Sequence, residues 1–306
     1  MDIADRIGVS LDFIQGISLE DALDLVYEAG FKGVEIVPSD YQARTGFPAG
    51  PTPGFWARTT SQERRREIRG LLDRFDFVTV HSQHIDLNIA SANPGIREES
   101  VRQYLDNIEL AHDIGSRTCT FHIGHRTRSV NSQADCRRYS AEFGCKAAVL
   151  AEKYEVMLGF ESGTKSISDM LHGVKGSEDD LDYIAGAIED IGSPWLGIHV
   201  DVANSVGPLY EGGRTSREWT IRWIEGFAGR IVEVHWSGIF QTSIGRTKHT
   251  SLTNDNVQDF SLVLKAFEEA DYQGPIIFEI MAKDVQQWLD YNLASKELLI
   301  ECASSV

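Results

Sequence analysis

The sequence lacks the features by which membrane, secreted and disulfide-bonded proteins are recognised. None of its apolar runs is long enough to span a bilayer. Its first residues, MDIAD, have neither the basic start nor the apolar run of a signal peptide. The four cysteines show no CxxC pair and no disulfide-like spacing, which suits a reducing compartment. These absences predict a cytoplasmic protein with no membrane partner.

Positive charge and phosphate-binding loops are also scarce. The 306 residues include 29 Lys and Arg against 46 Asp and Glu, which gives a net charge of −17. Nucleic-acid binding depends on basic side chains that neutralise phosphates, so the composition argues against a DNA or RNA partner. The first predicted strand is followed by SLDFIQG, which matches neither GxGxxG nor a Walker motif. A dinucleotide-binding fold is therefore disfavoured.

What the sequence does contain is one alternation, repeated eight times. Short apolar runs predict strands, and amphipathic stretches between them predict helices. The first helix begins with a capping box at Ser18 and ends at Gly30. Further helices are predicted over 97–114, 177–191 and 254–270. The strands are predicted over 6–12, 33–37, 77–84, 118–125, 156–162, 196–204, 231–238 and 275–280.

This alternation defines the predicted fold. Strands that alternate with helices pair in parallel through right-handed crossovers. Eight such units in about 300 residues predict an α/β protein, a (β/α)8 TIM barrel forming a single domain over residues 1–306. One irregular insertion, 39–60, is rich in Gly, Pro and aromatic residues. This insertion is equally consistent with a variable surface loop and with a lid in which Phe55 and Trp56 shield a substrate from water.

The ends of the last four strands carry the chemistry. Active sites of TIM barrels lie where the strands end. Three carboxylates and one imidazole at these ends suit Mn²⁺, Co²⁺, Mg²⁺ or Zn²⁺ better than copper or an iron–sulfur cluster. We therefore predict one divalent metal ion, with manganese as the first choice. The predicted ligands are Glu161, Asp201, His235 and Glu279.

Two segments carry a resemblance to a known family. VTVHSQHIDLNIAS and REESVRQYLDNIELAHDIGSRTCTFHIGH resemble the third strand, following helix and fourth strand of the xylose-isomerase-like barrel superfamily. That superfamily includes sugar and sugar-phosphate isomerases and epimerases and also endonuclease IV. The resemblance covers nearly the whole chain and implies that the four residues above are metal ligands. In the epimerase branch it also implies that Glu161 and Glu279 are the acid–base pair.

The sequence departs from that family in two places. The family usually has a histidine three residues after the sixth-strand aspartate, where this chain has Asn204. After the seventh strand the nuclease branch has D-x-H, whereas this chain has Thr247, Lys248 and His249. The glycine-rich run that usually follows is replaced by TSLTNDN. Two expected ligands of a trinuclear zinc cluster are therefore missing, which disfavours the endonuclease.

The chemistry of the ligand set can also be argued without the family. Moving a proton on a carbon beside a carbonyl needs stabilised enediolate oxygens, which a metal provides, and a nearby carboxylate base. Glu161 and Glu279 lie on strands separated by two others, so they could flank opposite faces of a chelated substrate. Two bases would give epimerisation and one shuttling base would give isomerisation. Elimination starts from the same enolate, so the three outcomes stay open.

Other residues at the same end of the barrel are predicted to contact the substrate. His81 and His122 end the third and fourth strands. His249 is predicted to lie in a loop after the seventh strand, near Arg246 and Lys248. These two cations could hold a substrate phosphate or carboxylate, although a solvated loop fits equally well. The residues predicted to bind substrate are His81, His122, Asn204, Arg246, His249 and Trp56.

A second pair is predicted one layer below the ligands. His199 lies two residues before Asp201, and Glu233 lies two residues before His235. Alternate residues of a strand face the same way, so both side chains point into the barrel. We expect His199 and Glu233 to satisfy each other and to support the ligands above them.

Together these observations predict a divalent-metal-dependent isomerase or epimerase of a small keto-sugar or related polyol. The alternative is a dehydratase or lyase on the same scaffold, acting on an inosose, a dehydroshikimate or an oxidised glycoside. An endonuclease IV-like phosphodiester hydrolase is less favoured, and a homo-oligomer stays open.

Overall fold

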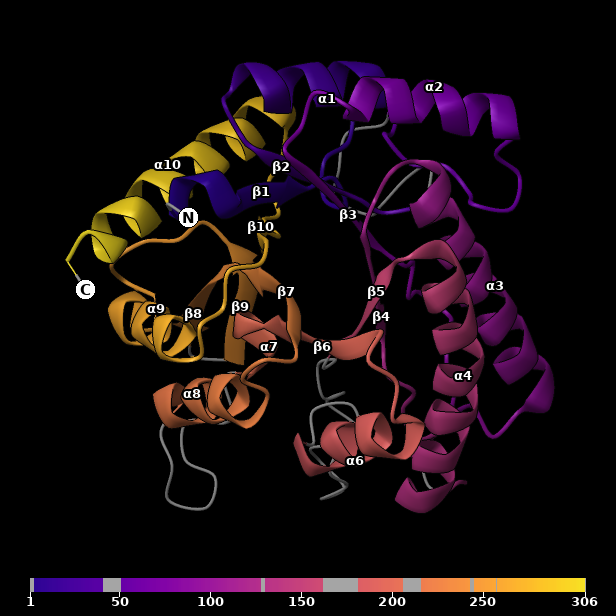
Figure 1. Ribbon diagram of the computed structural model, residues 1–306. Coiled ribbons are helices and arrows are strands. Elements are labelled where there is room, and N and C mark those ends of the chain that lie inside the picture. Colours follow the sequence, from indigo (N-terminus) through magenta and orange to yellow (C-terminus); the bar gives the residue numbers. More distant parts are fainter. Residues whose placement is uncertain are drawn as a thin grey trace.

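Eight parallel strands close into a barrel (Figure 1). The structure is a computed structural model and describes residues 3–40, 51–127, 130–161, 181–205, 216–242, 245–256 and 258–305. Around the barrel the strands follow the order β1-β10-β7-β6-β5-β4-β3-β2, which confirms the predicted (β/α)8 fold. The strands are β1 Ile7–Ser10, β2 Gly33–Ile36, β3 Phe77–His81, β4 Thr118–His122, β5 Met157–Glu161, β6 Leu196–Asp201, β7 Ile231–Trp236 and β10 Ile276–Phe278.

The helices surround the barrel and connect its strands (Figure 1). A short 3-10 helix, Ile3–Arg6, precedes β1. None of the helices in the described ranges is long and apolar enough to cross a membrane. The helices are α1 Leu19–Glu28, α2 Gln62–Leu72, α3 Pro94–Asp113, α4 Gln133–Tyr154, α6 Leu181–Ile191, α7 Val202–Ser205, α8 Ser216–Gly226, α9 Phe260–Glu269 and α10 Val285–Ala303.

Helix capping decides where the predicted helices start. Ser18 caps α1 as expected, and Gly30 follows that helix with a φ of 74°. The helix predicted over 254–270 begins only at residue 260. The prediction was wrong there because the side chain of Asp259 caps α9. Asn93 likewise caps α3, which starts at residue 94, three residues before the predicted start. Residues 177–180 of another predicted helix lie outside the described part of the chain.

The two faces of β6 differ in polarity. On β6, Ile198 and Val200 belong to the hydrophobic core that joins the barrel to its helices. The alternate residues face the barrel interior, where Glu35, His199 and Glu233 are completely buried. The interior of this barrel therefore contains ionisable groups that only other interior groups, or a bound species, can satisfy.

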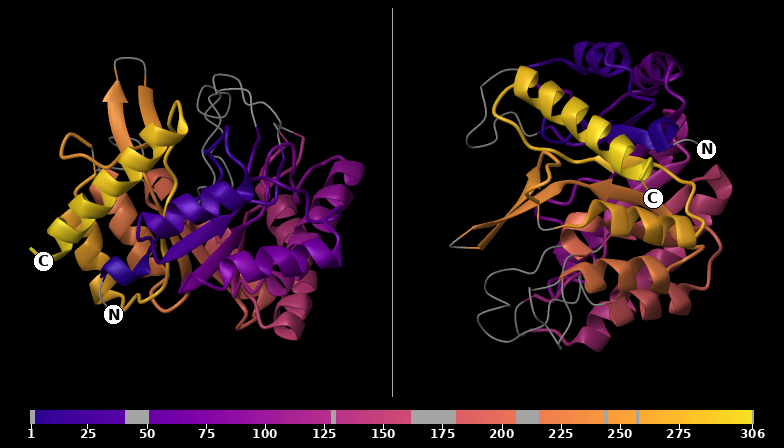
Figure 2. Two further views of the ribbon diagram at one scale, coloured as in Figure 1. Left: turned by 90° about the horizontal axis from the view of Figure 1, so that it is seen from above. Right: turned by 90° about the vertical axis from the view of Figure 1, so that its left-hand side faces the viewer.

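A two-stranded hairpin follows β7 and projects beyond the end of the barrel (Figure 2). It consists of β8, Gly238–Thr242, and β9, Gly245–Thr250, paired antiparallel. The prediction that His249 lies in a loop was wrong, because His249 belongs to β9. The return strand of the hairpin carries His249 back to the barrel, where its Nδ1 lies 3.1 Å from Glu279 Oε2.

The predicted insertion over 39–60 is described only in part. Residues 41–50 lie outside the described chain. The returning segment is held to the loop after β1, because the carbonyl of Pro51 accepts hydrogen bonds from the backbone N–H groups of Gly16 and Ile17. Phe55 and Trp56 are half-buried. The lid function of this segment stays a prediction.

The close packing of β6 against β7 can be tested by adding a methyl group at a glycine of β6. A Cβ atom at Gly197 would lie 2.1 Å from the carbonyl oxygen of Arg230, whereas one at Gly70, in α2, would meet nothing within 4 Å. We expect Gly197→Ala to lower the free energy of unfolding in urea by about 1–3 kcal/mol. The matched Gly70→Ala variant should raise it by about 0.5–1 kcal/mol. Equal effects of the two substitutions would contradict the described strand packing.

Candidate metal centre

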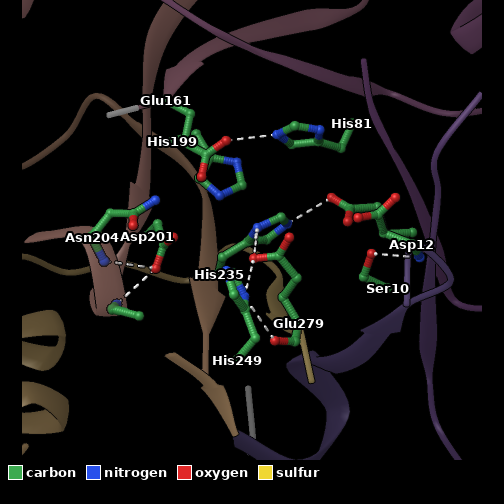
Figure 3. Close-up of polar contacts among 12 residues, drawn as sticks. Ser10, Asp12, His81, Glu161, His199, Asp201, Asn204, His235, His249 and Glu279 are labelled. Atoms are coloured by element: carbon green, nitrogen blue, oxygen red, sulfur yellow. Dashed lines mark hydrogen bonds and ion pairs between the residues drawn. The ribbon is translucent and has the colours of Figure 1, made fainter. Parts of the chain in front are cut away.

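The four predicted ligands lie at the same end of the barrel (Figure 3). Glu161 and Asp201 are the last residues of β5 and β6, His235 lies one residue before the end of β7, and Glu279 directly follows β10. The side chains of the first three are almost completely buried, and that of Glu279 is 12% exposed. Parallel strands that end at one rim explain why residues so distant in the sequence meet there.

Glu161 is held by histidines from two neighbouring strands. The Oε2 atom of Glu161 lies 2.6 Å from His81 Nε2 and 3.3 Å from His122 Nε2. Burial alone would raise the pKa of this carboxyl, but His122, His199 and His81 lower it well below its usual range. Glu161 is therefore ionised although it is buried.

Glu279 is held in the same way at the opposite side of the site. Its Oε2 atom lies 3.1 Å from His249 Nδ1 and 3.4 Å from His235 Nδ1 (Figure 3). Burial would raise the pKa of Glu279, yet His249 and His235 lower it well below its usual range. Both predicted acid–base residues are thus carboxylates that accept contacts from imidazoles.

Asp201 has no such partner. Its Oδ1 atom accepts hydrogen bonds from the backbone N–H groups of Ala203 and Asn204 at the start of α7. Its Oδ2 atom is buried and finds no hydrogen-bond partner among the described residues. Burial and the negative charges of Glu161 and Glu279 raise the pKa of Asp201 to about 6. A buried carboxylate oxygen without a hydrogen-bond partner is suited to binding a cation.

The donor atoms at this rim fit a divalent metal ion. Besides Asp201 Oδ2, the Nδ1 atom of His235 is buried and makes no hydrogen bond within the described chain. Among the described residues, three compact groups have donor atoms within 4.8 Å of one another, and Asp201 and Glu279 belong to none of them. Binding all four predicted ligands to one ion therefore requires these side chains to move closer. The compact groups are His81, His122 and Glu161; Glu161, His199 and His235; and Glu35, Glu233 and His235.

Sequence reasoning missed Glu35. This residue of β2 is completely buried, and its Oε2 atom accepts a hydrogen bond of 2.8 Å from His235 Nε2. The two carboxylates Glu35 and Glu279 raise the pKa of His235 well above its usual range, against the opposing effect of burial. The signal in the sequence was a single charged residue in the apolar run GVEIV.

His199 and Glu233 are neighbours, as predicted, but they are not hydrogen-bonded. They are paired in register between β6 and β7, and His199 Nδ1 lies 3.6 Å from Glu233 Oε2. Burial and the nearby carboxylate of Glu35 raise the pKa of Glu233 to about 8, while burial and His235 lower that of His199 well below its usual range. Both groups are therefore neutral at pH 7, and the predicted contact is not a charged pair.

The remaining predicted substrate contacts are only partly described. Asn204 lies in α7, and its Oδ1 atom accepts a hydrogen bond of 2.6 Å from Lys248 Nζ. The backbone of Arg246 pairs with Gln241 in the hairpin, and its side chain lies outside the described part of the structure. Trp56 is half-buried in the segment before α2, and its carbonyl accepts a hydrogen bond from Thr60 Oγ1. Their contacts with substrate stay predictions.

Comparison with known proteins identifies the family. The sequence profile of the xylose isomerase-like TIM barrel family matches residues 23–300, so the chain belongs to this family. An uncharacterised protein of Methanocaldococcus jannaschii is 24% identical over 298 residues, which cover 97% of this chain and 94% of that protein.

Solved structures share the fold at low sequence identity. A D-tagatose 3-epimerase-like protein superposes with a TM-score of 0.73 and 21% identity, covering 98% of both chains. L-ribulose 3-epimerase has a TM-score of 0.70 and 18% identity, covering all of this chain and 95% of that one. The 3-keto-D-glucoside 4-epimerase of E. coli has a TM-score of 0.69 and 14% identity, covering 96% and 99%. At these identities the likeness establishes the fold.

The raised pKa of Asp201 generates a prediction for the metal-free protein. An aspartate whose pKa is about 6 when folded and about 4 when unfolded makes the protein less stable as pH rises through this interval. With a chelator present at pH 8, Asp201→Asn should therefore raise the free energy of unfolding by about 1–3 kcal/mol. The gain should shrink as pH is lowered toward 4, where Asp201 is protonated.

The matched control is Asp284→Asn, because Asp284 caps α10 at an exposed position and asparagine caps equally well. This control should change stability little at either pH. A stability loss at pH 8 for Asp201→Asn, or a gain independent of pH, would contradict the described environment of Asp201.

Proposed function

We propose that the protein is a divalent-metal-dependent isomerase or epimerase acting on a small keto-sugar or related polyol. The ligands of the metal would be Glu161, Asp201, His235 and Glu279. The observation that carries the proposal is the pair of ionised glutamates, Glu161 buried and Glu279 largely buried, on either side of two donor atoms. These atoms, Asp201 Oδ2 and His235 Nδ1, make no hydrogen bond to any described residue. Manganese is the first choice of metal, and carboxylate and imidazole donors of this kind also suit cobalt, magnesium and zinc.

A bound divalent ion would polarise the carbonyl and hydroxyl oxygens of a substrate and stabilise the negative charge that develops on them. The chain's own contribution is proton transfer. Glu161 ends β5, Glu279 directly follows β10, and both are ionised, so each can take a proton from a carbon beside the carbonyl. If both glutamates act, on opposite faces of the substrate, they would invert a carbon centre. If one glutamate acts alone, it would move a proton between adjacent carbons.

The histidines beside each glutamate would control these proton transfers. The pKa of His81 is raised to about 9 because Glu161 outweighs the effect of burial, and that of His249 is raised to about 9 because Glu279 does the same. Each charged imidazole can orient its carboxylate and donate a hydrogen bond to a substrate hydroxyl. His122, Asn204, Arg246 and Trp56 complete the proposed substrate contacts.

Polar side chains line a small cavity between the strand ends of β1 and β2 and the returning segment of the insertion. Its volume of about 20 Å³ has room for one water molecule or one hydroxyl group of a substrate. Its polar lining residues include Asp12, Gln15 and Ser39. Asp12 lies near the ligand layer (Figure 3). Polar side chains of this kind suit the hydroxyl groups of a small carbohydrate, and the sugar epimerases with the same fold support that substrate class.

Exchange of substrate protons with solvent tests the two glutamates. In D₂O, wild-type protein should place deuterium on the carbon beside the carbonyl of a converted ketose. Glu161→Gln and Glu279→Gln should each slow conversion by about 10²–10⁴-fold, since glutamine cannot accept the proton. NMR of the products over a panel of ketoses measures the exchange.

Glu301→Gln is the control, because it removes a carboxylate from the exposed side of α10 and should leave the rate unchanged. Near-normal exchange in both glutamine variants, with metal retained, would contradict the assignment. Inososes and an abasic DNA duplex belong on the same panel. Water loss from an inosose would favour the dehydratase alternative, and cleavage of the duplex would favour the hydrolase.

A further inference from the structure

His235 lies between two carboxylates that contact different nitrogen atoms of its ring. Its Nε2 atom lies 2.8 Å from Glu35 Oε2, and its Nδ1 atom lies 3.4 Å from Glu279 Oε2. Glu35 comes from β2, which is separated from β7 by β1 and β10 in the barrel order. The contact therefore crosses the barrel interior, with Glu35 completely buried and His235 2% exposed.

The hydrogen bond to Glu35 distinguishes the two nitrogen atoms. A carboxylate only accepts, so the Nε2 atom of His235 must carry the proton in this contact. The Nδ1 atom, which makes no hydrogen bond within the described chain, is left for a metal ion. The other oxygen of Glu35, Oε1, is buried and has no hydrogen-bond partner among the described residues, so the contact with His235 is the one hydrogen bond of this side chain in that part of the chain.

Packing alone does not fix this orientation. The ring of His235 stacks on that of His81 at 5.4 Å and 27°, and the ring of His199 meets it edge-on at 4.1 Å and 87°. These contacts restrict the plane of the ring. A half-turn about the Cβ–Cγ bond keeps the plane and exchanges the positions of nitrogen and carbon atoms. The contacts of the two nitrogen atoms therefore select between the two orientations, and the contact with Glu35, at 2.8 Å, is shorter than the 3.4 Å contact with Glu279.

We propose that Glu35 is a positioning residue for the metal centre: it holds His235 with Nε2 protonated and Nδ1 directed to the metal. The inference rests on the proposed metal-dependent function and adds a residue to it. A carboxylate that binds the distal N–H of a ligating histidine also makes the ligating nitrogen more basic, which strengthens metal binding. Glu35 itself would touch neither metal nor substrate.

Zinc affinity, measured by competition with a chelator, tests the proposal without reference to activity. Glu35→Leu, which removes the acceptor, should weaken Zn²⁺ binding by about 10–100-fold. Glu35→Gln keeps an acceptor oxygen but loses the charge, so its affinity should fall between those of wild type and Glu35→Leu. Glu301→Leu is the control for the loss of a carboxylate, because Glu301 lies at an exposed position of α10, outside the barrel interior. Its affinity should stay within about 3-fold of wild type.

Nitrogen-15 NMR of the zinc-loaded wild-type protein provides a second readout that needs no substitution at Glu35. The His235 signal, identified by its loss in His235→Asn, should show a proton on Nε2 and zinc on Nδ1. Zinc on Nε2, or unchanged affinity in folded Glu35→Leu, would overturn the role of Glu35 while leaving the metal centre intact. Wild-type protein that binds no zinc would instead overturn the proposed function, and the role of Glu35 with it.

Discussion

The site depends on negative charge that is buried at the end of a barrel. Removing a carboxylate from water is costly unless other groups compensate its charge. Glu161 and Glu279 are compensated by histidines, each from a different strand or from the hairpin. At Asp201, backbone N–H groups bind one oxygen, and the other oxygen has no hydrogen-bond partner in the described part of the chain. This incomplete compensation is what makes the rim suited to a cation, and the proposed chemistry follows from it.

The barrel supplies the geometry for this arrangement. Parallel strands end at one rim, so single residues on β5, β6, β7 and after β10 form a cluster without any shared sequence motif. The interior layer below adds Glu35, His199 and Glu233, which are completely buried. That layer connects opposite sides of the barrel, so the orientation of His235 depends on a residue from β2. Fold stability and ligand geometry are thus coupled through the same interior side chains.

Much of this structure could be predicted from the sequence, for identifiable reasons. Apolar runs of strand length and helical periodicity predict the eight repeats, and strand ends predict which residues meet at the rim. Capping by Asp259 shortened one predicted helix, and local pairing placed His249 on β9 instead of in a loop. Glu35 was missed because its partner is 200 residues away, and nothing local indicates which interior residues face each other across a barrel. The pairing of His199 with Glu233 was predictable because neighbouring strands are in register.

The central claim is that Glu161, Asp201, His235 and Glu279 hold one divalent metal ion. The most direct measurement is an anomalous difference map from crystals grown with Mn²⁺, recorded where manganese scatters anomalously. The account predicts a single strong peak in contact with all four side chains, including Asp201 Oδ2 and His235 Nδ1. A peak among Glu35, Glu233 and His235, a peak held only by His81, His122 and Glu161, or no peak at all would contradict it.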